Sequence, residues 1–540
     1  MKNTAIEEIR STLKKLDYDI DNININVSVP KNKKFGDLST NIAFIISKKI
    51  NLPTMEVATI ISNKLESSNI FKEINIAEPG FINFTINPSA IVNNIKDIID
   101  NGSNYGKNTS FENKTVLVEF VSANPTGPLT VGHGRGAILG DILSNIFEWN
   151  GYKVTREYYY NNAGRQMRML GESVKSRYFE ILNKKVGFPF PENGYQGDYI
   201  KDIAKEIINT DSNIDIDEVD IFKDVAEKYI FKDINNTLKN LGITFDLFFN
   251  ENTLYENKSI YKVIDKLRSK KLIYEKDGAT WFEGTKVGRE NDRVLIKKTG
   301  EPTYRLPDMA YHINKLDREY DLCVDIFGAD HMDAYPDVLE VVKQLDYDQS
   351  RIKVLIHQFI SILKNNKQVK MSTRKATYIT LDELIDEVGS DVVRYFFIMR
   401  SLNSHLNFDL DIAKEKSEKN PVYYIQYAHA RICAILNKNN INTEKANLNL
   451  LNSEDDIAII NNLINFEEIV LKLKDNLEPQ ILSNYLYDLA TKFHKYYAHN
   501  RVINDDDDEL TKARLVLIKA VKIIINNGLN ILGITSPKSM

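Results

Sequence analysis

The pattern of hydrophobic and polar positions divides the chain into three parts. Residues 1–112 alternate helical and strand-like segments, residues 113–395 combine short apolar strands with amphipathic helices, and residues 396–540 show helical periodicity throughout. A length of 540 residues fits three or four domains at roughly 150 residues each. The expected fold class is therefore α/β and multidomain, with an N-terminal α/β domain and linker, a central α/β domain and an all-α C-terminal domain.

The two outer parts have simple patterns. In the N-terminal part the pattern predicts helices at 6–16 and 41–49 and strands at 23–29 and 80–84, before a polar linker at 101–113. In the C-terminal part we expect helices at 421–436, 457–473, 478–497 and 510–532.

The central part predicts a doubly wound parallel sheet. Residues 116–120 are nearly all apolar, as expected for a strand covered on both faces. An amphipathic helix follows, with apolar residues at 138, 139, 142, 143, 146 and 147, and then a second strand at 152–159. This strand–helix–strand order begins a Rossmann-like sheet, which we expect to resume at 322–327 and 354–359 after insertions at about 165–290.

Composition indicates a folded protein without a strong charge bias. Lys and Arg number 70 against 75 Asp and Glu, so the formal net charge is −5 and no uniform positive field attracts nucleic acid. Any contact with nucleic acid has to come from local basic patches. The two cysteines, Cys323 and Cys433, are too few for a disulfide framework or a four-cysteine zinc site. We expect a cytoplasmic protein with neither a signal peptide nor a membrane span.

The densest chemical signal is the loop of residues 122–136, between the first strand and the first helix of the central part. Its glycines allow a ligand to approach the backbone, the helix start offers free N–H groups, and His133 adds a side-chain donor. This combination suits a phosphate-bearing substrate. A glycine-rich turn with a solvated histidine is the alternative without a ligand.

The same loop also matches the dinucleotide-binding fingerprint of dehydrogenases. Gly132, Gly134 and Ala137 have the required spacing, and Glu157 lies about 20 residues further on, where a ribose-binding acid is expected. That fingerprint needs its first glycine near the end of the strand, whereas here a longer stretch containing Pro125 intervenes. The loop is too long for that tight turn.

Two further segments suit phosphate chemistry. Residues 364–375 carry five cations and no acid directly after a predicted strand. Such a loop suits a polyphosphate whose charge rises during phosphoryl or nucleotidyl transfer, although a charge run is also typical of a solvated face. Gly328, Asp330 and His331 follow a buried strand, where α/β proteins bind ligands. A turn with internally satisfied side chains is the alternative for this segment.

Together these segments resemble a known family. Residues 130–133 resemble the HIGH motif and residues 370–374 the KMSKS loop of class I aminoacyl-tRNA synthetases, in the same order and about 240 residues apart. Further stretches resemble arginyl-tRNA synthetases in particular, at 119–129, 158–164, 304–308, 327–331, 386–389 and 420–431. The resemblance extends over nearly the whole chain.

The resemblance implies roles for individual residues. Those that would hold ATP are Gly132, His133, Gly328, Asp330, His331, Lys370, Met371 and Ser372, and those that would act in catalysis are Thr130, His133, Lys370 and Arg374. Those that would hold arginine are Glu119, Asn124, Tyr304 and Asp308. Carboxylates that accept two parallel hydrogen bonds recognise a planar guanidinium best, which supports the two acids independently.

Three arginine-binding candidates have structural alternatives. Glu119 is an acid in an apolar strand, so it meets either a cationic ligand or an internal Lys or Arg. Asp308 follows Pro307 at an expected helix start, where an acid also serves as a cap. Tyr304 is either a ligand contact or a half-buried aromatic whose hydroxyl is bonded locally.

Three positions depart from the family pattern. Thr130 replaces the first histidine of HIGH, Thr373 replaces the second lysine of KMSKS, and Asn162 stands where many relatives have Asp. At Thr130 an imidazole donor to phosphate is replaced by a shorter hydroxyl, which can still donate one hydrogen bond. At Thr373 the charge is left to neighbouring cations.

The resemblance implies a function as well. The chain would ligate L-arginine to tRNA(Arg) in two steps, with ATP as a substrate accompanied by Mg²⁺ and with no zinc. Its N-terminal domain would contact tRNA, its helical C-terminal domain would read the anticodon region, and tRNA would have to bind before the adenylate forms. We expect a cytoplasmic monomer that binds neither DNA nor membranes. Two other functions stay open: a tRNA-binding relative without catalysis, because of Thr130, and a nicotinamide-dependent oxidoreductase.

Overall fold

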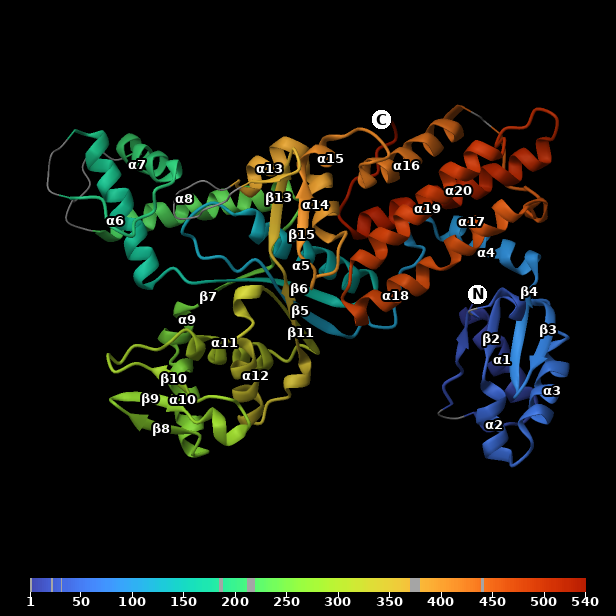
Figure 1. Cartoon of the computed structure of the whole chain (residues 1–540), viewed down its shortest axis with the longest axis horizontal. Helices are drawn as coiled ribbons and strands as arrows, with labels where there is room; N and C mark the ends of the chain where they lie inside the picture. Colours follow the sequence, from blue (N-terminus) through green and yellow to red (C-terminus); the bar gives the residue numbers. More distant parts are fainter. Residues whose placement is uncertain are drawn as a thin grey trace.

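The computed structural model describes residues 2–20, 23–30, 32–183, 188–210, 219–369, 379–438 and 441–540. Figure 1 shows a central sheet region, a bundle of long helices beside it, and a separate small α/β unit at the N-terminal end of the chain. On the other side of the sheet, one helical lobe and one mixed lobe extend away from it (Figure 1). None of the helices in the described part of the chain is long and apolar enough to cross a membrane.

The N-terminal unit is a four-stranded antiparallel sheet in the order β1-β2-β4-β3, packed with three helices. Its elements are α1 (Lys2–Lys15), β1 (Val27–Ser28), β2 (Leu38–Thr40), α2 (Ile42–Ile50), α3 (Thr54–Leu65), β3 (Phe71–Ala77) and β4 (Phe81–Ile86). The expected strand at 23–29 is paired over only two residues. The predicted alternation of buried and exposed side chains is nevertheless present, because Ile23, Ile25 and Val27 are buried while the residues between them are exposed.

The central sheet has five parallel strands in the order β12-β11-β5-β6-β7. They are β5 (Thr115–Glu119), β6 (Lys153–Tyr160), β7 (Leu247–Asn250), β11 (Leu322–Gly328) and β12 (Ile352–His357), and α5 (Val131–Trp149) connects the first two. β6 and β7, which follow β5 in the sequence, lie on one side of β5. The later strands β11 and β12 lie on its other side. The strand order therefore reverses between β5 and β11, which is where open α/β sheets bind ligands.

The region expected to hold only insertions also contains a strand of the sheet. β7 pairs in parallel with β6, so the prediction that the sheet resumes only at 322 is wrong. The strand is a four-residue edge strand between charged helices, too short to give a clear pattern. Around it lie α6 (Gly164–Ile181), α7 (Asp198–Thr210), α8 (Val219–Asn240), α9 (Asn252–Glu256), α10 (Ser259–Ser269), β8 (Ile273–Lys276), β9 (Ala279–Phe282) and β10 (Arg293–Ile296).

The remaining elements complete the central part and form the helical bundle. They are α4 (Pro88–Asn101), α11 (Arg305–Asp317), α12 (Tyr335–Gln344), β13 (Ile360–Lys364), β14 (Lys367–Gln368), α13 (Leu381–Val388), α14 (Ser390–Ile398), β15 (Leu406–Asp409), α15 (Leu410–Lys414), α16 (Pro421–Lys438), α17 (Glu454–Ile464), α18 (Phe466–Asn476), α19 (Gln480–His499) and α20 (Asp508–Ile531). The single helix expected at 457–473 is two helices. They are separated at Asn465, a residue type that favours turns over helix interiors.

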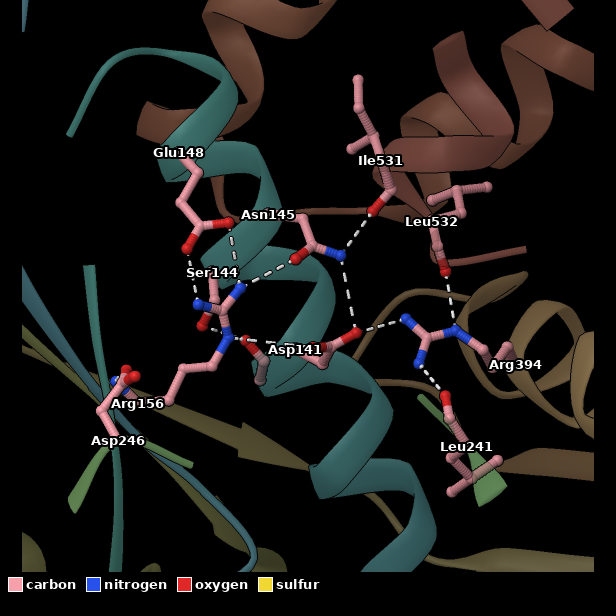
Figure 2. Close-up of polar contacts among 11 residues, drawn as sticks. Asp141, Ser144, Asn145, Glu148, Arg156, Leu241, Asp246, Arg394, Ile531 and Leu532 are labelled. Carbon is pink, nitrogen blue, oxygen red and sulfur yellow. Dashed lines mark hydrogen bonds and ion pairs between the residues drawn. The ribbon is translucent and has the colours of Figure 1, made fainter. Parts of the chain in front are cut away.

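A buried polar network ties α5 to the bundle (Figure 2). Arg394 on α14 is 1% exposed, donates to Asp141 on α5, and also donates to the carbonyl of Leu532 just past the end of α20 at 2.8 Å. One turn along α5, the amide of Asn145 donates to the carbonyl of Ile531 at 3.1 Å. Side chains of α5 and α14 thus satisfy carbonyls that the end of α20 leaves without intrahelical partners.

We expect Arg394→Gln to lower the melting temperature of the chain by several degrees, because removal of one partner from a buried ion pair costs about 3–5 kcal/mol. Scanning calorimetry of Arg394→Gln, Asp141→Asn and the double variant measures the coupling. The decrease in melting temperature of the double variant should be smaller than the sum of the decreases of the two single variants. Lys492→Gln, which removes a partly exposed pair with Asp488, is the control and should change the melting temperature little. Additive losses would contradict a coupled pair.

Candidate active site

A cavity of about 810 Å³ lies at the carboxyl ends of the parallel strands. Residues that follow β5, β6, β11 and β12 line it, together with the first turns of α5, α11 and α12. The cavity brings together all the predicted site residues that the structure describes: Glu119, Asn124, Thr130, Gly132, His133, Tyr304, Asp308, Gly328, Asp330 and His331. The other predicted site residues lie outside the described part of the chain: Lys370, Met371, Ser372 and Arg374.

The cavity has a strongly acidic lining. Four carboxylates face it, from Glu119, Glu251, Asp308 and Asp330. Among the lining residues in the described part of the chain, none is a Lys or Arg. Histidines provide the only side chains there that can become positive at ordinary pH. A cavity of this size and charge suits a small ligand with a cationic group.

Beneath the cavity, three buried acids lie side by side on the sheet. Asp325 on β11 is the register partner of Glu119 on β5, and Glu119 is the register partner of Glu157 on β6. The fully buried ammonium of Lys315 on α11 bridges the first two, with 2.6 Å to Asp325 Oδ1 and a close contact to Glu119. Arg318, just past the end of α11, pairs with Glu157. The internal salt bridge considered for Glu119 is therefore present, although Glu119 also lines the cavity.

This acid row fixes the position of α11. The hydroxyl of Tyr311 donates to Glu157 Oε1 at 2.5 Å, and His312 Nε2 lies 3.1 Å from Asp325 Oδ2. Burial alone would raise the pKa of Asp325, but Lys315 and His312 outweigh it and lower the pKa below its usual range. With its middle held in this way, α11 presents Asp308 in its first turn to the cavity. Asp308 is the fourth residue of α11 and makes no capping hydrogen bond, so the capping alternative considered for it is wrong.

Two cavity acids have no Lys or Arg partner among the described residues. Burial raises the pKa of Asp308 to about 6, with Glu251 and Glu119 adding to the effect and His312 and His331 opposing it. Burial also raises the pKa of Glu251, which accepts hydrogen bonds from the Tyr159 hydroxyl at 2.6 Å and the Asn161 amide at 2.7 Å. A bound cation would favour the ionised form of both acids.

The start of α5 presents a hydrogen-bond donor to the cavity. The backbone N–H of Thr130, the residue before the helix, donates to His133 Nδ1 at 3.1 Å. The neutral ring must then carry its proton on Nε2, which is left free to donate. Burial lowers the pKa of His133, which favours the neutral ring at pH 7. Close packing of this helix on the sheet requires Gly140, because a Cβ there would lie 2.1 Å from Phe120.

The chain between β5 and α5 is strained where it lines the cavity. Val121 has φ +67° and Ser122 has φ +46°, and a β-branched residue rarely adopts this left-handed conformation. Such strain costs on the order of 1–3 kcal/mol and is concentrated at functional sites. Here it lets the Ser122 hydroxyl reach back to Glu119 at 2.9 Å.

The other predicted contacts differ in how they are held. Asn124 is fixed between two elements, because its amide donates to Gln166 on α6 at 3.0 Å and its oxygen accepts the Asn161 N–H at 3.0 Å. Tyr304 is 83% exposed at the cavity, so the half-buried alternative for it is wrong. His331 stacks on Phe327, with ring centroids 5.0 Å apart.

The dinucleotide fingerprint is not formed. Gly132 and Gly134 lie inside the first turns of α5, not in a tight turn at the end of β5. Glu157 is fully buried and engaged by Tyr311 and Arg318, so it is not available to a ribose hydroxyl. The geometry therefore contradicts the oxidoreductase interpretation.

Three family models match consecutive parts of the chain. A model described as the arginyl tRNA synthetase N terminal domain matches residues 3–86, one described as the class I (R) tRNA synthetase catalytic domain matches residues 94–396, and one described as the DALR anticodon binding domain matches residues 425–540. The chain belongs to the arginyl-tRNA synthetase family.

Individual relatives agree with the family assignment. An arginine–tRNA ligase from Desulfotalea psychrophila is 48% identical over 95% of this chain and 94% of its own length. One from Chlorobium phaeobacteroides is 44% identical over the full length of both chains. The solved structure of Thermus thermophilus arginyl-tRNA synthetase matches the whole chain with a TM-score of 0.75 at 19% identity, which is a similarity of fold.

Two residues of this arginyl-tRNA synthetase family member were not predicted from the sequence. They are Glu251, which lines the cavity, and Lys315, which pairs with the buried acids beneath it. Glu251 lies in the region interpreted as insertions, and its position directly after β7 could have indicated a site residue only if that strand had been recognised. Lys315 was missed because a lysine in an amphipathic helix usually points to solvent. The apolar strand containing Glu119 was the one available sign that a buried cation was needed.

We expect Asp308→Asn to raise the melting temperature at pH 8 and to raise it much less at pH 4.5. Because the folded-state pKa of Asp308, about 6, lies above the unfolded value, its ionisation destabilises the fold as pH rises through the interval from about 4 to 6. Asp321→Asn is the control of opposite sign. Lys114 and the Thr115 N–H lower the pKa of Asp321 to about 2, so its charge stabilises the fold at pH 8. A lower melting temperature for Asp308→Asn than for the unaltered protein at pH 8 would contradict a raised pKa of Asp308.

Proposed function

We propose that the protein is an enzyme that ligates L-arginine to tRNA(Arg) in two ATP-dependent steps. The observation that carries the proposal is the acidic cavity at the reversal point of the sheet. There Asp308 and Glu251 face the ligand space with no Lys or Arg partner in the described part of the chain. Membership of the arginyl-tRNA synthetase family supports the same function.

Arginine would bind with its guanidinium towards Asp308 and Glu251. A planar guanidinium donates parallel hydrogen bonds to carboxylates, which the point-like ammonium of lysine does not. Both acids have a pKa raised by burial, so pairing with a cation restores their charge and adds affinity. Tyr304 would cover the side chain from the rim. Glu119 and Asn124, held by β5 and the following loop, would orient the α-ammonium end.

ATP would bind at the start of α5. The Nε2–H of His133, the Thr130 hydroxyl and the free N–H groups at the helix start, including that of Gly132, would donate to its phosphates. Gly328, Asp330 and His331 would hold the nucleoside, since Gly328 ends β11 beside the cavity and the other two residues follow it directly. Mg²⁺ would arrive with ATP, bound by the phosphates.

The cationic loop that begins at Lys370 would complete the site. Lys370, Met371, Ser372 and Arg374 lie outside the described residues. We propose that they bind the phosphates of ATP as charge develops there.

The first step needs no general base in the protein. A carboxylate oxygen of arginine attacks the α-phosphorus of ATP, the bond to pyrophosphate breaks, and arginyl-adenylate forms. Because the carboxylate is already a nucleophile, the residues of the cavity act by positioning and by stabilising charge. In the second step the terminal ribose hydroxyl of tRNA attacks the arginyl carbonyl, and AMP leaves.

The domains would divide this work. We propose that residues 1–112 contact tRNA, that residues 113–395 carry out the chemistry, and that residues 396–540 bind the anticodon region, supported by the matches to the N-terminal and DALR models. The chain would act as a cytoplasmic monomer. The two buried, unpaired cysteines fit a reducing compartment, and light scattering of the purified protein tests the monomer.

Pyrophosphate exchange tests the proposal directly. With arginine, ATP and tRNA(Arg), labelled pyrophosphate should enter ATP, and omission of arginine should abolish the exchange. A protein that binds tRNA without catalysing exchange would be a non-catalytic relative, which Thr130 leaves open. Such a result would overturn the proposed enzyme.

We expect Thr130→Val to slow exchange by roughly tenfold to a hundredfold, because it removes one charge-assisted hydrogen bond to phosphate. Valine keeps the shape and the backbone N–H that bonds to His133 Nδ1, although it also removes the contact between the Thr130 hydroxyl and Nδ1 at 3.2 Å. His133→Ala should lose more, since it removes the Nε2–H donor. Thr491→Val, an exposed helical position in α19, is the matched control and should leave exchange unchanged. An unchanged rate for Thr130→Val would mean that its hydroxyl does not contact phosphate.

A further inference from the structure

A cluster of three arginines surrounds one buried carboxylate beside the cavity. Asp337 on α12 is 1% exposed. The Nε atoms of Arg289 and Arg293 donate to its two oxygens at 3.0 and 2.9 Å, and Arg305 Nε lies 3.4 Å from Oδ2. We call these four residues the arginine cluster. The three arginines come from the loop before β10, the start of β10 and the start of α11.

The arginine cluster has more positive charge and more donors than Asp337 requires. Three guanidinium groups against one carboxylate leave two positive charges close together, and this repulsion is unfavourable without a further anion. Among the described residues, the terminal nitrogens of the three arginines have no hydrogen-bond partner. Arg305 Nε is also buried there without a hydrogen bond. The three side chains stay about one-third exposed, so their free donors are accessible.

Helix dipoles add to this positive charge. Arg305 is the first residue of α11, and Asp337 lies in the first turn of α12. The N-terminal ends of both helices therefore meet at the arginine cluster, and each favours an anion. The surface combines fixed arginine forks, which match phosphate geometry, with two helix N-termini.

The arginine cluster adjoins the cavity but lies outside it. Tyr304 and Tyr335 line the cavity, whereas Arg289, Arg293 and Arg305 do not. A phosphate bound by the arginines would therefore belong to a molecule that extends beyond the cavity. ATP would lie inside the cavity with its phosphates at the start of α5. A polynucleotide strand whose last residue enters the cavity would carry phosphates across the rim.

We propose that the arginine cluster binds backbone phosphates of the single-stranded 3′ end of tRNA as that end enters the cavity. This proposal rests on the proposed function, because it assigns the strand that the second step requires. The contacts are to phosphate, so they fix the position of the strand without selecting its bases.

Binding of tRNA(Arg) at several salt concentrations tests the proposal. Arg293→Gln should weaken binding about tenfold at low salt, as expected for one charge-assisted contact, and should reduce the salt slope by roughly 0.7–1. Asp337 keeps two arginine partners in this variant, so the fold is retained. Arg293→Lys should recover part of the affinity. Arg268→Gln, in the same lobe but paired with Asp265, is the matched control and should bind like the unaltered protein.

A tRNA(Arg) shortened by its terminal unpaired nucleotides locates the contact. Arg293→Gln and the unaltered protein should bind this shortened tRNA equally, because the phosphates in question are absent. A tenfold loss that persists with the shortened tRNA would place the contact elsewhere on tRNA and overturn the proposal. So would unaltered binding of full-length tRNA by Arg293→Gln.

The KM for ATP in pyrophosphate exchange separates the two sources of phosphate. It should stay within about twofold of the unaltered value in Arg293→Gln. A KM for ATP that rises while tRNA binding is unchanged would assign the arginine cluster to ATP and overturn the proposal. An unaltered protein that binds tRNA but catalyses no exchange would instead refute the proposed function alone, since the binding comparison needs no activity.

Discussion

Asp325, Glu119 and Glu157 are neighbours on three adjacent strands, and burial of these three carboxylates together is the constraint on which the site depends. Carboxylates this close repel one another strongly in a medium of low dielectric constant, so the sheet is stable only if cations are buried with them. Helix α11 supplies those cations at one-turn spacing, through Lys315 and the following Arg318. Docking of α11 is thereby fixed in rotation as well as in position, and its first turn is directed to the cavity.

The distribution of charge then separates two tasks. The acids below the cavity pair with protein cations, whereas Asp308 and Glu251 have no Lys or Arg partner among the described residues. Burial raises the pKa values of these two acids. These two acids lower the stability of the ligand-free protein and are available to a cationic ligand, a form of preorganisation that requires the rigid support of α11. Positive charge is concentrated outside the cavity, in the arginine cluster. On the far side of the sheet, the network around Arg394 holds α5, and with it His133, against the helical bundle (Figure 2).

Much of this organisation follows from the sequence. The β5–α5–β6 unit, the strand at 322–327 and the long C-terminal helices have periodic patterns that tertiary contacts do not override. The predicted site residues in the described part of the chain converge because they follow strands of one parallel sheet. β7 and Glu251 could not be predicted, because a four-residue edge strand has no clear periodicity. The pairing of Lys315 with Glu119 depends on a contact 196 residues apart, which no local pattern encodes.

The central claim is that the carboxylates of Asp308 and Glu251 in the cavity select arginine by its charge. Citrulline has nearly the same shape as arginine but a neutral ureido group, so it tests charge without changing size. In tRNA-dependent pyrophosphate exchange, the account predicts that kcat/KM for citrulline is at least about a thousandfold below that for arginine, because a neutral ligand would leave Asp308 and Glu251 unpaired. Comparable values of kcat/KM for citrulline and arginine would contradict it.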